Sequence, residues 1–354
     1  MCHRLLPAVL AALLAACAQS EPPSPDLKAS GPDGPAATDR SADRGVRAIQ
    51  LPADESPHSD PEEWYYYTGR LVDGDGAVYG FELVVFQVVV ADKAIYISHH
   101  AITDLQKQSF AHAMKTSLVD QRGATQGFSF DVDGWKMSGH AGKDQLSAAL
   151  PGYALELAVV AAKPPVKHYG TGWMHIGSPQ PFYYYSYTRM AASGTLTVDG
   201  KVRSVTGEVW MDHQWGELGG LGKDYDGWDW FSLRFDDGAE TMIFVVRGGG
   251  FSGGTHVDAA GTALPLAAQD FAITASGHQW VSPTTAGAYP QGWTIKVPAL
   301  GIDVTVSPLL ADQEVSDRYG WMPLYWEGLC AVTGTRNGQP AKGSAYVELT
   351  GYAK

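Results

Sequence analysis

Three titratable residues, Asp212, His213 and Asp229, lie among tryptophans in the middle of the sequence. Four of the eleven tryptophans fall between residues 210 and 230, at Trp210, Trp215, Trp228 and Trp230. A carboxyl group beside indole rings is partly desolvated, so its pKa rises. A carboxylic acid that keeps its proton near neutral pH can act as a general acid, and aromatic faces can shelter a cation. This composition suits acid-initiated chemistry on an apolar molecule, and it is also common in the core of a β-barrel.

The segments that position these residues are expected to be β-strands. Aromatic and β-branched residues dominate runs such as 63–69, 78–87 and 182–187, and these residue types favour strands. Asp-Gly and Asn-Gly pairs, which favour hairpin turns, separate the runs at 73–76, 133–134, 199–200, 236–238 and 337–338. No long amphipathic helical pattern interrupts the series. The sequence therefore predicts an all-β protein.

The number of candidate strands exceeds what one barrel of about eight strands can hold. We therefore expect two tandem antiparallel β-barrels, the first in residues 51–204 and the second in residues 205–354. The tryptophan-rich cluster would then lie at the junction of the two barrels.

The N-terminus is expected to be a targeting segment. A polar start is followed by the apolar run Leu5–Ala16, which is too short for a permanent membrane span. The run ends in Leu14-Ala15-Ala16-Cys17, which resembles a bacterial lipobox and implies cleavage before Cys17 and lipidation of its sulfur. An ordinary secretory signal with an incidental cysteine is the alternative. Residue Ala18 resembles the sorting signal for the outer membrane, and residues 18–50 are expected to be a flexible linker.

Composition excludes several classes of function. The formal net charge of −13 argues against nucleic acid as a partner. The three cysteines are Cys2, Cys17 and Cys330, so removal of the signal and lipidation would leave one thiol, with neither an intramolecular disulfide nor a cysteine-type zinc site. No later segment is long and apolar enough to be transmembrane.

Several motifs together resemble one family. They occur in order at 63–69, 100–104, 183–189, 210–216, 227–231, 325–328 and 343–352. The chain resembles the two-domain lipocalin-like family that includes bacterial carotenoid 1,2-hydratase (hydroxyneurosporene synthase) and many proteins labelled predicted secreted hydrolases. The resemblance covers nearly all of residues 55–353. It implies two lipocalin-like barrels with a ligand site at or between them, and it implies catalytic roles for His213 and Trp215, and for Trp228 and Asp229.

The chemistry of such a family, hydration of an isolated C=C bond, needs an acid, a shelter for a carbocation and a placed water, but no cofactor. We expect Asp229 to be the acid and His213 or Asp212 to hold the water. The expected ligand-binding residues are aromatic or histidine side chains, namely Trp210, Trp215, Trp228, Trp230, Tyr185, Tyr187 and His100. The alternative interpretation is structural: a turn cap, a hydrogen-bonded core histidine and core indoles.

Other polar residues bear on this hypothesis. Neighbouring residues of a strand point to opposite faces, so one of His99 and His100 should face inward. A metal site from His100, His175 and His213 has no ligand spacing to support it, and we predict none. Ser186 lacks the Gly-x-Ser-x-Gly turn of a serine hydrolase. If Arg189 paired with Asp212 or Asp229, it would lower the pKa of that carboxyl and weaken the acid hypothesis.

The sequence therefore predicts a lipid-anchored protein of the bacterial cell envelope, at the periplasmic face of the outer membrane. Its expected partners are the membrane, through the anchor, and an extended hydrophobic small molecule, polyene or lipid-like, which it would hydrate or isomerise without a cofactor. A non-catalytic carrier or sensor of hydrophobic ligands is the alternative, and a structural protein of the envelope is a third. A membrane-anchored position outside the inner membrane counts against a carotenoid as the substrate.

Overall fold

The computed structural model describes residues 26–27, 46–175, 181–217, 225–249, 251–316 and 324–353. The predicted lipidation site Cys17, and all of the predicted linker apart from residues 26–27 and 46–50, lie outside this part of the chain. None of the described helices is long and apolar enough to cross a membrane.

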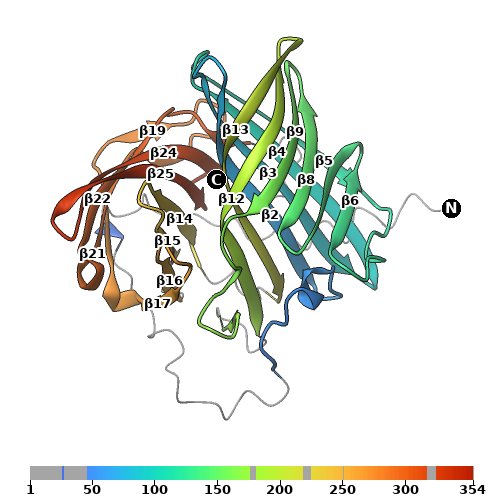
Figure 1. The fold of residues 1–354 in the computed structure, drawn as a ribbon, viewed down its shortest axis with the longest axis horizontal. Helices are drawn as coiled ribbons and strands as arrows, with labels where there is room; N and C mark the ends of the chain where they lie inside the picture. Colours follow the sequence, from blue (N-terminus) through green and yellow to red (C-terminus); the bar gives the residue numbers. More distant parts are fainter. Residues whose placement is uncertain are drawn as a thin grey trace.

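Two large antiparallel sheets make up the molecule (Figure 1). The first sheet has the order β5-β4-β3-β2-β13-β12-β9-β8-β7-β6. Its strands are β2 (Glu62–Asp73), β3 (Val78–Val90), β4 (Lys93–Asp104), β5 (Ser109–Ser117), β6 (Phe128–Val132), β7 (Trp135–His140), β8 (Lys143–Leu150), β9 (Tyr153–Ala161), β12 (Phe182–Val198) and β13 (Lys201–Gly216). The short strands β10 (Val166–Lys167) and β11 (Trp173–Met174) also pair with β12.

The second sheet has the order β1-β18-β21-β22-β24-β25-β14-β15-β16-β17, with β23 beside β24. Its strands are β1 (Asp26–Leu27), β14 (Gly227–Phe235), β15 (Glu240–Arg247), β16 (Ser252–Val257), β17 (Ala263–Ala267), β18 (Ala272–Ala275), β21 (Trp293–Val297), β22 (Ile302–Pro308), β23 (Glu314–Val315), β24 (Tyr325–Arg336) and β25 (Gln339–Thr350). A separate hairpin joins β19 (Gln279–Val281) and β20 (Ala288–Pro290). Single turns of 3-10 helix form η2 (Ala53–Glu55), η3 (Ala268–Asp270) and η4 (Pro298–Leu300).

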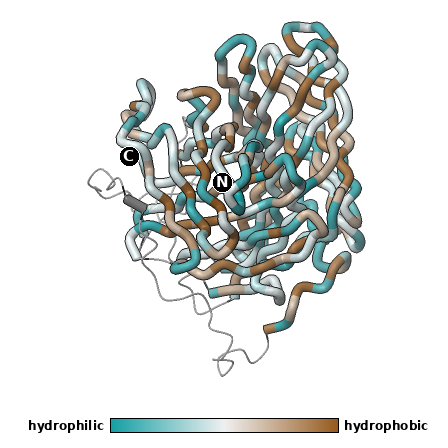
Figure 2. Tube along the Cα trace, turned by 60° about the vertical axis from the view of Figure 1, so that its left-hand side comes forward, coloured by the Kyte–Doolittle hydropathy of each residue, from teal (hydrophilic) through white to brown (hydrophobic). Residues whose placement is uncertain are grey.

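Turn chemistry explains why the strands fold back where they do. The predicted two-residue turns Asp133-Gly134, Asp199-Gly200 and Asn337-Gly338 all have positive φ at both residues. Asp, Asn and Gly tolerate this left-handed region, which matches the twist of the flanking strands. Alternating hydrophobic and hydrophilic residues then run along the strands (Figure 2). The predicted all-β, antiparallel architecture is confirmed.

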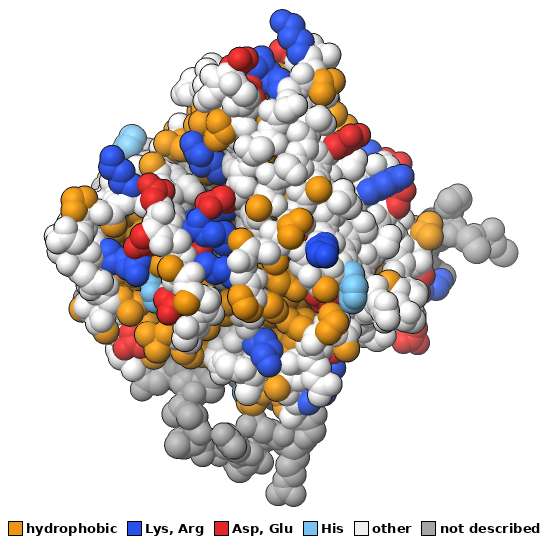
Figure 3. Space-filling model, viewed as in Figure 1, with side chains coloured by type: hydrophobic (Ala, Val, Ile, Leu, Met, Phe, Trp, Pro, Cys, Tyr) orange, Lys and Arg blue, Asp and Glu red, His pale blue; other side chains and the backbone are white. Residues whose placement is uncertain are grey.

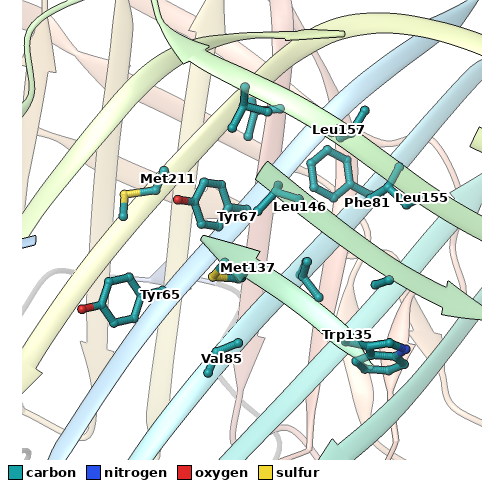
Figure 4. Packing of buried hydrophobic residues seen from close by; sticks show 14 of the residues in the cluster. Tyr65, Tyr67, Phe81, Val85, Trp135, Met137, Leu146, Leu155, Leu157 and Met211 are labelled. Carbon is teal, nitrogen blue, oxygen red and sulfur yellow. The ribbon is translucent and has the colours of Figure 1, made fainter. Parts of the chain in front are cut away.

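Each sheet curves around a core of its own. The first closes toward a barrel: Lys115 on β5 donates to the Asp133 carbonyl after β6, and the Gln121 side chain bonds the backbone of Asp131. Its interior is filled with side chains such as Tyr67, Phe81 and Met137 (Figure 4). The second sheet is a half-barrel around Phe231, Trp293, Trp326 and their neighbours.

The change from one sheet to the other follows β13. Residue 204, where the sequence suggested the domain division, lies inside this strand, and all of Lys201–Gly216 pairs within the first sheet. The second sheet takes over from Gly227 onward.

Candidate functional site

A third apolar cluster joins the two sheets face to face. Its members come from strands of both sheets, and they are Tyr66, Val84, Met174, Phe182, Tyr184, Trp210, Trp230, Met242, Phe244, Val246, Phe251, Leu329 and Tyr346. We call it the shared core. Because side chains alternate along a strand, each of β2, β12, β13 and β14 contributes to it from one face only. Figure 3 shows hydrophobic side chains grouped in the middle of the face viewed, with charged groups on either side.

Asp212 lies at the centre of a hydrogen-bonded group in the shared core. Its carboxylate accepts from Trp210 Nε1 at 2.6 Å, from Tyr184 OH at 2.8 Å and from the Ser186 hydroxyl. Ser186 Oγ is also 2.8 Å from His168 Nε2. Burial raises the pKa of Asp212 to about 7, although these donors oppose the rise.

Three glutamates face the same region from β3, β24 and β25. Tyr325 OH donates to Glu82 at 2.6 Å, and Tyr66 OH donates to Glu327 at 2.7 Å. Glu348 stands directly opposite Glu327 in the β24–β25 register and opposite Trp230 in the β14–β25 register. We call Glu82, Asp212, Glu327 and Glu348 the carboxyl cluster.

Burial raises the pKa of each member of the carboxyl cluster. It raises the pKa of Glu348 to about 7, opposed by a hydrogen bond with Trp228 and assisted by the charge of Asp212. The pKa of Glu327 is raised by burial and then by Glu82 and Glu348, and that of Glu82 by burial and the charge of Glu348. Among the described residues no lysine or arginine pairs with any of the four. The protonated forms of these four carboxylic acids therefore persist to a higher pH than they would in water.

The cluster keeps free hydrogen-bonding capacity. Glu82 Oε2, Glu327 Oε2 and His99 Nε2 are buried and have no partner within the described part of the chain. Buried polar atoms are nearly always satisfied by protein, water or ligand. Glu348 is only partly buried, as are Trp64, Phe86 and Trp228, which pack against the shared core. The site therefore has an interior of acids and a partly exposed aromatic edge.

The predicted site residues separate into three places. Asp212, Trp210, Trp228 and Trp230 face the region between the sheets. His213, Trp215, Tyr185, Tyr187 and His100 point into the first barrel. Asp229 lies on the opposite face of β14, against the core of the second sheet. The structure does not bring Asp212, His213 and Asp229 together. Asp212 and His213 are neighbours on β13 and therefore point to opposite faces of the first sheet, and Asp229 points away from the shared core on β14.

His213 belongs to a polar group inside the first barrel. Its Nε2 is 2.7 Å from Glu63 Oε1, and its Nδ1 is 3.2 Å from Tyr185 OH. Burial lowers the pKa of His213 to about 4, against the effect of Glu63. His58 Nδ1 is 2.8 Å from the same Glu63 oxygen.

His100 bonds the Glu82 carbonyl at 2.7 Å, whereas His99 points the other way, 2.7 Å from Tyr325 OH.

Asp229 is a buried, ion-paired carboxylate. Arg247 Nε donates to it at 3.1 Å and Tyr352 OH at 2.9 Å. Burial raises its pKa to about 6, and Arg247 and Tyr352 oppose that rise. Arg189, considered above as a possible partner of Asp212 or Asp229, instead binds Glu240 and Glu208. An arginine does pair with Asp229, but it is Arg247 and not Arg189.

Sequence reasoning missed Glu82 and His168 and gave Glu327 and Glu348 no part in the expected site. Glu82 is the one acid in an apolar strand run, 78–87. Because buried carboxylates are rare, this lone acid was the signal that could have identified the residue. His168 follows a Pro-containing loop and has no local signal. The histidines His100, His175 and His213 do not form a ligand set among the described residues; the trio that does converge is His58, Glu63 and His213.

Comparisons with known proteins agree over nearly the whole chain. A family model described as AttH-like matches residues 42–352. The dehydratase asqC of Emericella nidulans is 22% identical over 224 residues, covering 58% of this chain and 60% of that protein, so this chain spans less than two thirds of that curated relative. A crystal structure of an AttH protein from Nitrosomonas europaea is 27% identical with a TM-score of 0.78, covering 88% of this chain and 98% of that one. Kievitone hydratase from Nectria haematococca shares the fold at 16% identity, with a TM-score of 0.71 over 92% of this chain and 97% of that one.

Proposed function

Because the chain belongs to the AttH-like family, we propose that it binds a small hydrophobic molecule between its two sheets and adds water to, or removes water from, that molecule by acid catalysis. The observation that carries this proposal is the carboxyl cluster: three buried acids and the partly buried Glu348, all with raised pKa values, face an aromatic region with no described cation paired to them. The names of two relatives, a dehydratase and a hydratase, agree with it.

Glu348 is the group assigned to donate the proton. It is partly exposed, so a ligand can reach it, and its pKa of about 7 leaves it substantially protonated at neutral pH. Transfer of its proton to one carbon of a C=C bond leaves a carbocation on the other, beside Trp228 and Trp230. Water then adds to the cation, and the proton that this water loses returns to the Glu348 carboxylate. Dehydration is the same sequence reversed.

The other cluster members would hold the water and help to keep Glu348 protonated. Glu327 Oε2 and Glu82 Oε2 have no described partner, so each is free to bind a water or a ligand hydroxyl. Asp229, the acid expected from the sequence, lies behind β14 with Arg247, and we assign it a structural role. If Glu348 transfers no proton, the same aromatic region between the sheets fits the alternative of a carrier or sensor of hydrophobic ligands.

A direct test compares wild type with Glu348→Gln, using as the matched control Asp229→Asn, which lies on the neighbouring strand β14 and on the other face of the sheet. Lipids that copurify with each protein are extracted, and hydroxylated and unsaturated species are quantified by mass spectrometry. We expect the product fraction to fall by at least about 100-fold in Glu348→Gln, since general acids contribute about 10²–10⁴-fold, and to persist in Asp229→Asn. Equal ratios in wild type and Glu348→Gln, with bound lipid present, would favour the carrier and contradict catalysis by this acid.

We also propose that Cys17 carries the lipid anchor and that the protein faces the periplasm from the outer membrane. The apolar run and the Leu14-Ala15-Ala16-Cys17 sequence support this. Radiolabelled palmitate should enter the wild type and not Cys17→Ser; incorporation into both would rule out this site.

A further inference from the structure

A second polar group occupies the other side of β13, inside the first barrel. His58 lies just before β2, Glu63 is on β2 and His213 is on β13. The atoms His58 Nδ1 and His213 Nε2 are 2.8 Å and 2.7 Å from Glu63 Oε1. One ligand atom from each of the three residues lies within 4.8 Å of the other two. Two imidazole nitrogens therefore converge on one carboxylate oxygen, and all three atoms are of metal-binding type.

The outward-facing atoms of these residues already have partners. Asp54 Oδ1 lies 3.9 Å from His58 Nε2, and Tyr185 OH lies 3.2 Å from His213 Nδ1. Glu63 Oε2 accepts from Gln87 Nε2 at 3.0 Å and from the His58 backbone N–H at 2.8 Å. Metal-bound histidines commonly have such a carboxylate or hydroxyl on the second ring nitrogen, which fixes the ring and its tautomer.

Aromatic stacking fixes the ring planes as well. Trp215 stacks on His58 with centroids 4.1 Å apart and an angle of 8°, and Tyr65 stacks on His213 at 3.9 Å. Glu63 and His213 are fully buried, and the His58 side chain is 17% exposed. The site is thus rigid on the barrel side and open only at His58, where an ion could enter.

We infer that His58, Glu63 and His213 form a binding site for a divalent transition-metal ion such as Zn²⁺. Two imidazoles and one carboxylate form a ligand set typical of zinc sites that keep an open position. A bound ion would displace the proton from His58 to solvent, and the two neutral imidazoles with one carboxylate would then carry one negative charge, which partly balances a divalent ion. Histidine spacing did not suggest this trio, because 150 residues separate Glu63 from His213.

The site is independent of the proposed hydration chemistry. The carboxyl cluster faces the region between the sheets, whereas the trio faces the interior of the first barrel. A failure of one proposal therefore leaves the other standing.

Titration of chelator-treated full-length protein with ZnCl₂, followed by isothermal calorimetry, tests the inference. We expect one ion per chain in the wild type. Glu63→Gln and His58→Ala should weaken binding more than tenfold, and Tyr185→Phe, which removes only an outer partner, should weaken it about tenfold. The control is His278→Ala, an exposed histidine elsewhere in the fold, which should bind as wild type does.

Binding of Co²⁺ gives a second readout, since coordination by the trio should produce visible absorption bands that Glu63→Gln lacks. Circular dichroism establishes that each variant is folded, and His58→Ala, at a partly exposed position before β2, is the variant least dependent on the core. Absence of saturable Zn²⁺ binding by folded wild type would overturn the inference, as would equal binding by wild type, His58→Ala and Glu63→Gln.

Discussion

At the scale of single residues, Asp212 and His213 show how one step along a strand separates two environments. Asp212 faces the shared core, where burial raises its pKa to about 7. His213 faces the first barrel, where burial lowers its pKa to about 4. Both shifts favour the uncharged form, because desolvation penalises whichever form is charged. The motif that contains both residues thus serves two separate sites.

The carboxyl cluster should make stability depend on pH in a particular direction. The pKa of Glu348 rises from 4.5 to about 7 on folding, so the folded state binds its proton more tightly than the unfolded state does. Its contribution is complete below pH 4.5 and is lost as the pH rises through about 7. Glu348→Gln cannot ionise, and we expect it to gain on the order of 1–3 kcal/mol relative to wild type between pH 5 and pH 9.

Urea unfolding at pH 5, 7 and 9 measures this difference. Comparing the variant with wild type removes the effects of other groups, such as Glu63, whose lowered pKa makes stability fall in acid. A constant difference at all three pH values would show that Glu348 ionises as freely in the folded protein as in the unfolded chain.

Residue types and alternation could have predicted the separation of Asp212 from His213. The period of two that distinguishes His99 from His100 applies equally to β13 and β14. It places Asp229 on one face of β14 and Trp228 and Trp230 on the other. No local pattern could show that Glu82 comes near Glu327, because their proximity depends on how the two sheets pack. The Tyr325–Glu82 hydrogen bond, which joins the two strands, links residues 243 apart in the chain.

At the scale of elements, β12 and β13 are the strands that carry both sites. They contain 17 and 16 residues, and they pair with each other over nearly their whole length. Alternate residues of β13 supply Asp212 to the shared core and His213 to the first barrel. The strand turns were predictable from Asp-Gly and Asn-Gly pairs, but the assignment of β13 to the first sheet was not, because its pairing with β2 joins residues far apart in sequence.

A buried ion cluster fastens β12 to β15. Glu240 on β15 accepts from Arg189 Nε at 2.6 Å and from Lys163 Nζ at 2.7 Å, and it is fully buried. Glu240→Gln would leave Lys163 without a described counter-charge and Arg189 with only the half-exposed Glu208, so we expect a loss of about 3–5 kcal/mol in the free energy of unfolding.

The matched control for Glu240 is Asp303→Asn, which breaks the exposed pair with Lys296. Exposed pairs contribute little, so this variant should lose less than about 1 kcal/mol. Chemical unfolding of both variants checks the contrast. Similar losses in the two would show that Glu240 is not a link between the sheets.

At the scale of the whole molecule, the two sheets pack against each other through common contacts. Each has its own core, but the shared core draws on both, and Tyr66–Glu327, Tyr184–Trp230 and His168–Thr255 are hydrogen bonds between them. The resemblance to the two-domain lipocalin-like family is confirmed by the AttH-like match. That resemblance, with the turn pattern, was enough to predict the architecture; the packing that unites the sheets required the structure.

We therefore expect a single unfolding transition in place of two. Calorimetry should give one peak, and it should coincide with the loss of far-ultraviolet circular dichroism and with the change in tryptophan fluorescence. Trp230→Ala, which opens a cavity in the shared core, should lower the stability of that one transition by about 3–5 kcal/mol. Two resolved peaks in wild type, with only one shifted by Trp230→Ala, would contradict a common cooperative unit.

The partly exposed aromatic edge of the shared core has a consequence for how this scaffold can diversify. Trp64, Phe86 and Trp228 lie on three different strands, and Trp228 is hydrogen-bonded to Glu348. Changes in size at Trp64 or Phe86 would alter which molecules fit while leaving the proton-holding groups in place. A library of variants confined to these two positions should therefore shift selectivity between ligands of different width without changing the acidic groups.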